Sequence, residues 1–226
     1  MASKTIDWGD GTGEKITLTY NAASGNQTVQ VSSAKNTTTS KRSKTITFAT
    51  TAGGSVTRTI TVTQKGLTES TVKFNPSAFV SGTYKSISGQ TNPVGKSETS
   101  TSYATVNLTN GSRATTNAIW SFDCSSIPEG AEIVSVTCKA KCSINNTQSS
   151  RISTRKIQLY SNTTAKGSAY TVANSTTAFS ITAGTWTRAE LQNARIRLDA
   201  TRGTSSTTTS YYFRFYGATL TVTYRI

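Results

Sequence analysis

The sequence predicts an all-β protein built of two β-sandwich parts, and three observations support this fold class. Residues 219–226 place Leu, Val, Tyr and Ile on one parity and Thr and Arg on the other, which is the pattern of a strand with one buried and one solvated face. The same alternation recurs along the 226 residues. Ser and Thr, roughly a third of the chain, alternate with apolar residues, which indicates solvated strand positions rather than low-complexity disorder.

The first part of the chain, residues 1–66, has the signals of a small sandwich. Its expected strands are Lys15–Tyr20, Gln27–Ser32, Lys44–Thr50 and Val56–Thr63. Ala52-Gly53-Gly54 gives the last two strands a hairpin turn, because glycine adopts positive φ without a steric cost. We expect residues 67–75 to form a linker and residues 76–226 to form a second domain.

Two segments of this first part resemble a known family. Residues 36–54 contain Arg-Ser-Lys-Thr-Ile followed by a Gly-Gly turn, and residues 59–66 read Thr-Ile-Thr-Val-Thr-Gln-Lys-Gly. The pair is similar to the C-terminal strands of a BACON domain, an immunoglobulin-like (Ig-like) module of gut Bacteroidales proteins and of phages that infect them. The resemblance implies a truncated Ig-like sandwich, because the opening strands and tryptophans of a full-length BACON domain are missing.

The second part has longer strands and more arginine. Its expected strands are Tyr103–Thr109, Ala118–Phe122, Glu132–Ile144, Thr154–Tyr160, Ala178–Ile181, Arg195–Thr201, Ser210–Tyr216 and Ala218–Tyr224. Eight antiparallel strands in one unit predict a jelly-roll sandwich. One short helix is expected at Thr187–Ala194, because Thr187 and Glu190 have the spacing of a capping box.

Three segments of the second part resemble jelly-roll domains of tailed-phage virion proteins. They are residues 127–138, which begin Ile-Pro-Glu-Gly-Ala-Glu-Ile, and residues 184–198 and 212–222. The likeness is to head-fibre, tail-fibre and decoration proteins. It implies a place on a virion or a cell surface more than it implies any particular partner.

The charge of the chain is strongly positive. Lys and Arg number 24 against 10 Asp and Glu, with no His, for a net charge of +14. Such a surplus favours an acidic partner, and scattered charge on a solvated surface is the alternative. We expect no nucleic-acid arm, because no block of five or more like charges appears. We also expect no membrane contact, because no apolar stretch has the length of a span.

The cysteines predict buried thiols rather than disulfides. They are three, Cys124, Cys138 and Cys142, and the start of the chain does not look like an export signal. Cys138 and Cys142 lie roughly 13 Å apart along an extended strand, too far for a disulfide, whereas Cys124 could in principle meet one of them. Three acids, Asp7, Asp10 and Glu14, suggest a calcium site, but their spacing is not that of an EF-hand loop. We therefore expect a solvated turn there, and no metal or cofactor.

Acid–base and nucleophilic chemistry find little support in the sequence. Glu190 is explained by helix capping, and Asp199 by pairing with Arg197 or Arg202. The abundant serines have no histidine to activate them. The sequence thus predicts a protein that is not an enzyme.

The best candidate for a binding face combines arginine and tyrosine. Arg195 and Arg197 share one parity, and so do Tyr212, Arg214 and Tyr216. Tyrosine rings stack on sugar C–H surfaces, arginine offers a planar donor fork, and both are frequent at interfaces. Cross-strand Tyr/Arg pairs that only stabilise the sheet are the alternative.

Together these patterns predict a non-enzymatic structural virion protein of a tailed bacteriophage, a capsid decoration or head-fibre protein. It would be made in the host cytoplasm and lie on the virion surface. Its partners would be the major capsid protein or fibre subunits, contacted through a basic surface. The alternative is a carbohydrate-binding adhesin, a tail fibre or surface lectin that recognises host glycans. A homo-oligomer is compatible with the sequence, which leaves the oligomeric state open.

Overall fold

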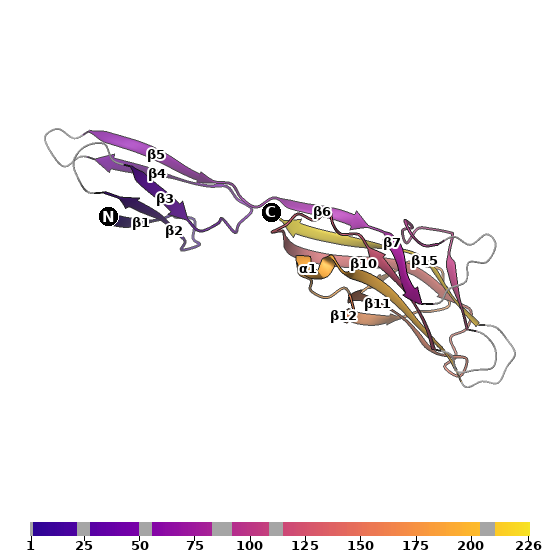
Figure 1. Ribbon diagram of the computed structural model, residues 1–226. Coiled ribbons are helices and arrows are strands. Elements are labelled where there is room, and N and C mark those ends of the chain that lie inside the picture. The colour runs from indigo at the N-terminus through magenta and orange to yellow at the C-terminus, as the bar shows by residue number, and fades with distance from the viewer. Residues whose placement is uncertain (1, 22–27, 50–55, 83–91, 109–114, 204–210) are drawn as a thin grey trace. The chain divides into compact units, whose positions relative to one another are not determined.

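The computed structural model describes residues 2–21, 28–49, 56–82, 92–108, 115–203 and 211–226 (Figure 1). The chain separates into two compact units, Met1–Glu69 (unit 1) and Ser70–Ile226 (unit 2), each with its own hydrophobic core. Both are built of antiparallel strands, and the described residues contain one short helix. The predicted all-β class is therefore confirmed.

Unit 1 consists of two small sheets. One sheet has the order β1–β2–β3, and the other is the hairpin of β4 and β5. The strands are β1 (Ala2–Asp7), β2 (Lys15–Tyr20), β3 (Val29–Ser33), β4 (Arg42–Ala49) and β5 (Thr57–Gln64). The hairpin pairs Ser43 with Thr63 and Ile46 with Ile60, as expected. The Gly-Gly turn lies outside the described residues.

Between these two sheets lies a core of few side chains. Trp8, Ile16, Leu18 and Ile46 are buried together. The parity of β2 explains its two contributions, because Ile16 and Leu18 alternate with Lys15 and Thr17. The first strand, β1, was not predicted, since most of its residues are exposed and only Ile6 packs on this core.

The first of the two sheets of unit 2 is called the β15 sheet. Its order is β13–β10–β15–β6, and β8 also pairs with β15. The strands are β6 (Glu69–Phe74), β8 (Ala104–Leu108), β10 (Glu132–Ile144), β13 (Phe179–Ile181) and β15 (Tyr211–Arg225). Residues 67–75 were expected to be a linker. They instead contain β6, which belongs to this sheet.

The second sheet of unit 2 is called the β14 sheet, and its order is β12–β11–β14–β9–β7. The strands are β7 (Pro76–Gly82), β9 (Thr115–Phe122), β11 (Ile152–Ser161), β12 (Thr164–Thr171) and β14 (Ala194–Arg202). From β8 to β15 the chain passes from one sheet to the other at every connection except the β11–β12 hairpin. The resulting orders, β8–β15–β10–β13 and β9–β14–β11–β12, are those of a jelly roll, with β6 and β7 added to it.

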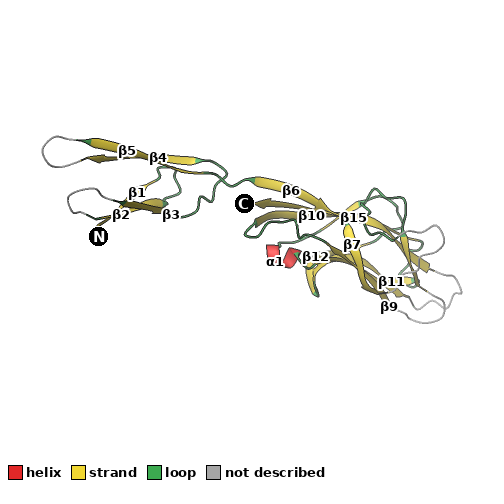
Figure 2. Ribbon diagram, turned by 45° about the horizontal axis from the view of Figure 1, so that its top comes forward, coloured by secondary structure: helices red, strands yellow, loops and turns green. Residues whose placement is uncertain are grey.

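The core of unit 2 fills the space between its sheets. Trp120 of β9, and Phe213 and Phe215 of β15, are fully buried. The rings of Trp120 and Phe215 lie 4.8 Å apart and join the two sheets. Figure 2 shows the helix, α1 (Arg188–Leu191), next to β12. Thr187 and Glu190 form the predicted capping box, although the helix ends earlier than expected.

One loop lies directly against β15. Residues 92–103, which we call the strap, approach β15 at Gly217, where a Cβ atom would stand 2.4 Å from the carbonyl oxygens of Lys96 and Ser97. The Ala218 amide donates to Lys96 O at 3.1 Å, and the β10–β15 pairing shifts register here. Two strands were expected at 210–224. The structure has one strand with an irregularity at Gly217.

Candidate functional site

The five predicted binding residues do not form one face. Arg195 and Arg197 lie on β14, whereas Tyr212, Arg214 and Tyr216 lie on β15. The predicted parities are correct on both strands, because the residues between them are buried. However, β14 and β15 belong to different sheets. Their outward side chains therefore point to opposite outer faces of the sandwich, and the single Arg/Tyr face was a wrong prediction.

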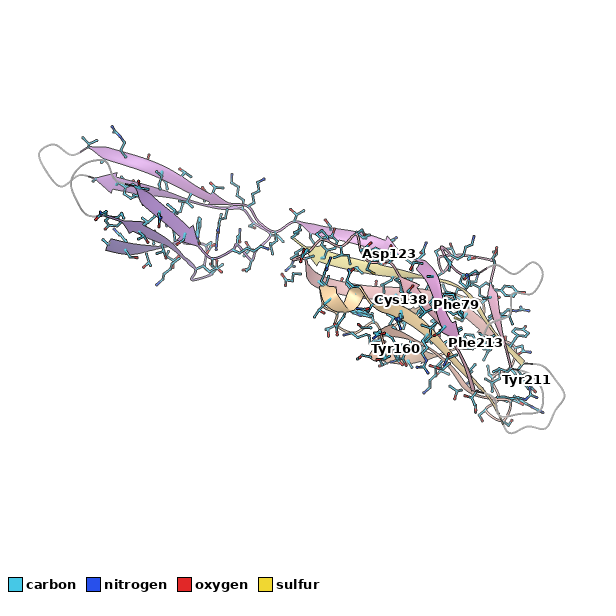
Figure 3. The ribbon with its side chains drawn as sticks, in the orientation of Figure 1. Phe79, Asp123, Cys138, Tyr160, Tyr211 and Phe213 are labelled. Carbon is cyan, nitrogen blue, oxygen red and sulfur yellow. The ribbon has the colours of Figure 1, made fainter. Side chains whose placement is uncertain are left out.

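On the outer face of the β14 sheet, Arg197 is held in place by two neighbours. Its Nε and its Nη2 contact Asp199 Oδ1 at 2.8 and 2.7 Å, which confirms the predicted pairing of Asp199. Its guanidinium carbon lies 5.4 Å from the ring centre of Tyr160, the tyrosine labelled on β11 in Figure 3. Arg195 stands on the same face, opposite Tyr160 in the register of β11 and β14.

On the outer face of the β15 sheet, Arg214 lies between two tyrosine rings. Its guanidinium carbon is 4.4 Å from the ring centre of Tyr103 and 4.1 Å from that of Tyr212. Such cation–π contacts contribute about 0.5–2 kcal/mol each. The Nε atom of Arg214 is buried without a hydrogen-bond partner among the described residues. The predicted Arg–Tyr association is thus real here, and the strap supplies a ring that was not predicted.

The strap makes Tyr216 a structural residue. Its side chain is buried, its ring packs on Tyr103 at 5.1 Å, and Lys141 Nζ lies 4.8 Å from its centre. Its hydroxyl lies 3.3 Å from Ser143 Oγ. Although its parity is outward, Tyr216 is not free to contact a ligand, because the strap covers it.

A polar cavity lies beside the strap, and sequence reasoning missed it. It has a volume of about 160 Å³ and opens on the outer face of the β15 sheet. Its lining residues come from β6, the strap, β10 and β15: Lys73, Glu98, Thr137, Lys139, Thr219 and Thr221. The alternation of apolar and polar residues along each strand already indicates that the strand residues of this lining face solvent. However, only the long-range pairing of β10 and β15, with Lys139 opposite Thr219 and Thr137 opposite Thr221, brings them together.

The acids between Asp7 and Glu14 meet an arginine in unit 1. Arg42 Nη1 lies 3.3 Å from Asp10 Oδ2 and 2.5 Å from Glu14 Oε2, and its guanidinium carbon lies 4.6 Å from the ring centre of Trp8. Hydrogen bonds from the Thr12 side chain and amide are the main causes of the lowered pKa of Asp10. Among the described residues, no group of three or more potential metal ligands is positioned to hold an ion.

Other carboxylates also stabilise local structure. Asp123, labelled in Figure 3, accepts the Ser125 amide at 3.0 Å, and hydrogen bonding to Ser125 lowers its pKa. Glu190 accepts from Lys166 Nζ at 2.8 Å and from the Thr187 amide, and these bonds lower its pKa. A general acid at neutral pH requires a shift in the opposite direction.

The three cysteines are free and buried, which agrees with the predicted thiols. Burial is the main cause of their raised pKa values: that of Cys124 is about 12, and those of Cys138 and Cys142 are also raised. Cys138, labelled in Figure 3, is on β10. A thiol that stays protonated is a poor nucleophile and metal ligand.

Comparison with protein families, with curated proteins and with solved structures finds no match to this chain. The resemblances to BACON and phage jelly-roll domains therefore stay predictions. Within the described part of the chain, no helix has the length and apolarity that crossing a membrane requires.

Proposed function

We propose that this chain is a non-enzymatic structural protein of a tailed-phage virion, a capsid decoration or head-fibre protein that docks on an acidic capsid surface through unit 2. The distribution of charge is the observation that carries this proposal. Unit 2 holds 16 Lys and Arg against 6 Asp and Glu, a surplus of 10, whereas unit 1 holds 8 against 4. At least ten cations of unit 2 therefore have no carboxylate of their own unit to pair with.

The cations lie on both outer faces of the sandwich. Lys73 and Lys139 are exposed on the β15 sheet. On the β14 sheet, Lys156 is exposed opposite Asp199, and the half-buried Arg195 lies further along the same face, opposite Tyr160. Complementary charge steers association and selects partners. Contacts of this kind are screened within about 8 Å at physiological ionic strength. A docking interaction built on them is therefore sensitive to salt.

The carboxylates favour a structural role as well. Asp10 and Glu14 hold Arg42, Glu190 closes the cap of α1, and Asp199 fixes Arg197. The lowered pKa values of Asp10 and Glu190 suit permanent anions that maintain local structure. These contacts support a protein that presents a rigid surface to a partner.

Co-sedimentation tests the proposal. The purified protein is mixed with empty capsids of the phage that encodes it, at salt concentrations from 50 mM to 1 M, and the pelleted fraction is measured. We expect retention at low salt and release of most of the protein toward 1 M, because screening weakens charged contacts. Retention that does not change over this range would contradict electrostatic docking.

Two double variants identify the docking face. Lys156→Gln with Arg195→Gln lowers the positive charge of the outer face of the β14 sheet, and Lys73→Gln with Lys139→Gln lowers that of the β15 sheet. Each removes two charges, so each is the control for the other. We expect one variant to pellet less at intermediate salt, and unchanged pelleting of both would count against the proposal.

A carbohydrate-binding adhesin is the second candidate, and the Tyr103–Arg214–Tyr212 stack favours it. Tyrosine faces suit sugar C–H surfaces, and a guanidinium suits carboxylate or hydroxyl groups. A glycan array probed with the intact protein and with Tyr212→Ala separates the two candidates. Binding that is lost in the variant would favour the adhesin over the virion component.

A further inference from the structure

The polar cavity on the outer face of the β15 sheet has the chemistry of a ligand site. Its floor is a block of four side chains in cross-strand register, Thr137 and Lys139 of β10 opposite Thr221 and Thr219 of β15. Lys73 of β6 and Glu98 of the strap complete the lining. Because Gly217 lets the strap approach β15, the position of Glu98 is set by backbone contacts.

Within the described part of the chain, the two lysines of this cavity have no partner for their ammonium groups. Neither Lys73 Nζ nor Lys139 Nζ has a hydrogen bond or an ion pair among the described residues. The one carboxylate in the lining, Glu98, accepts a hydrogen bond from Thr219 Oγ1. The lining therefore has a net positive charge and two ammonium groups available to an anionic ligand.

The other lining groups select among anions. Thr219 Oγ1 also lies 3.2 Å from Asn75 Oδ1, and one hydroxyl hydrogen cannot satisfy two acceptors. An ionised carboxylate has about four lone-pair sites on its two oxygens, so Glu98 keeps acceptor capacity for a donor on the ligand. Thr137 and Thr221 can each donate and accept. A ligand with acceptors only, such as a simple carboxylate or sulfate, would meet Glu98 as a repulsive neighbour.

We propose that this cavity binds a carboxylated sugar, such as a hexuronic acid residue of a glycan. The sugar carboxylate would lie between Lys73 and Lys139, and its hydroxyl groups would donate to Glu98 and exchange hydrogen bonds with the threonines. The volume, about 160 Å³, is below the usual 300–1,000 Å³ of small-molecule pockets. The cavity is therefore suited to one sugar unit rather than to an oligosaccharide.

The described residues that line the cavity include no aromatic ring, so the binding that we propose depends on charge and hydrogen bonds. We expect a dissociation constant on the order of millimolar for a free monosaccharide, as ordering costs offset much of the contact energy. The inference goes beyond the virion role and does not rest on it. A protein docked through its other sheet could still bind a sugar here.

Titration of the ¹⁵N-labelled full chain by NMR tests the site with three probes. D-glucuronate has a carboxylate and hydroxyl groups, D-glucose has hydroxyl groups only, and acetate has a carboxylate only. We expect saturable shifts of the Thr137 and Thr221 amides with glucuronate, and binding at least about tenfold weaker with glucose and with acetate, because each lacks one half of the recognised chemistry.

Single variants assign the binding to named groups. Lys139→Gln removes one ammonium, and Glu98→Gln removes the carboxylate but keeps an acceptor. We expect Lys139→Gln to weaken glucuronate binding about tenfold and to leave any weak glucose binding unchanged. Lys156→Gln, an exposed lysine on the opposite face, is the matched control and should bind as the unchanged protein does.

Three outcomes would overturn the inference. Acetate that binds as tightly as glucuronate would mean that the site recognises a bare carboxylate, such as an acidic side chain of a protein partner. Equal weakening by Lys139→Gln and Lys156→Gln would mean attraction by net charge alone. Shifts that saturate elsewhere, with Thr137 and Thr221 unmoved, would place sugar binding outside the cavity. Capsid co-sedimentation is unaffected by these results, so the two proposals fail separately.

Discussion

Units 1 and 2 are both β-sandwiches, but they are stabilised in different ways. Unit 2 packs aromatic and aliphatic side chains from two five-stranded sheets into one continuous core. Among its described residues, unit 1 has only four buried apolar side chains, Trp8, Ile16, Leu18 and Ile46, and it adds the buried polar side chains of Asn36 and Arg42. Small domains bury a smaller fraction of their surface. The comparison indicates that unit 1 replaces missing apolar burial with a charged and hydrogen-bonded centre.

Arg42 joins otherwise separate segments of unit 1. Its Nε donates to Gln64 Oε1 at 2.8 Å and its Nη2 to Ala34 O at 3.0 Å, in addition to its contacts with Asp10 and Glu14. The residue is 6% exposed, and such a charge is tolerated only where partners surround it. One side chain thus connects the loop between β1 and β2, the segment after β3 and the β4–β5 hairpin.

The largest expected effect is in the apolar core of unit 2. We expect Trp120→Ala to lower the free energy of unfolding of unit 2 by about 4 kcal/mol, because it removes a fully buried ring between the sheets. Hydrogen exchange of the full chain, followed peptide by peptide, measures it. Ile119→Ala, on the outward parity of the same strand, is the control. Faster exchange in unit 1 as well would show that the units do not unfold separately.

The next effect tests the charged centre of unit 1. We expect Arg42→Met to lower the free energy of unfolding of unit 1 by about 3 kcal/mol, since it leaves several acceptors unpaired and removes the contact with Trp8. Urea unfolding with peptide-resolved exchange measures the change. Lys41→Met, which removes an exposed charge from the adjacent position, should be nearly neutral. If both variants behaved alike, the charged centre would contribute nothing.

The third effect concerns the strap rather than either core. Gly217→Ala would place a methyl group against the Lys96 and Ser97 carbonyl oxygens, so the backbone must shift, at a cost of about 2 kcal/mol. We expect faster amide exchange in residues 92–103 and weaker glucuronate binding, with the core of unit 2 unchanged. Normal strap protection in this variant would show that the close approach is not required.

The smallest effect is the dependence of unit 1 on pH. The pKa of Asp10 is below its ordinary value of 3.8 in the folded protein, so its contribution is present above about pH 4 and is lost as the pH falls below that value. The carboxyl is exposed, and the effect should therefore be small. We expect the protection factors of unit 1, which correct for the pH dependence of intrinsic exchange, to fall below pH 4, and Asp10→Asn to flatten this dependence.

Local patterns predicted much of the fold. The bounds of β10 are those predicted, Glu132–Ile144. Parity also correctly separated the inward Phe213 and Phe215 from the outward Tyr212 and Arg214 on β15, and the outward Arg195 and Arg197 from their buried neighbours on β14. Parity tells which side of a strand a residue occupies, but not to which sheet the strand belongs. The predicted face failed for this reason, because the sheet assignment depends on long-range pairing that no local pattern contains.

Contacts between distant segments account for the other differences. The residues of the cavity look like ordinary solvated strand positions, and Glu98 joins them only because the strap returns to β15. Arg42 follows Lys41, and from the local sequence it would be taken for a surface residue. It is buried instead, with partners up to 32 positions away in the sequence. Both groupings follow from tertiary structure alone.

The strap connects two places on the outer face of the β15 sheet, the polar cavity and the Tyr103–Arg214 contact. Its backbone extends from Glu98 in the cavity to Tyr103 over Arg214, so one short peptide supplies a group to each of two places. A bound molecule that shifts this peptide at one place would alter affinity at the other, and such a coupling is equal in both directions. We therefore expect the affinity of this surface for a ligand in the cavity to depend on whether a second ligand contacts the Tyr103–Arg214 pair.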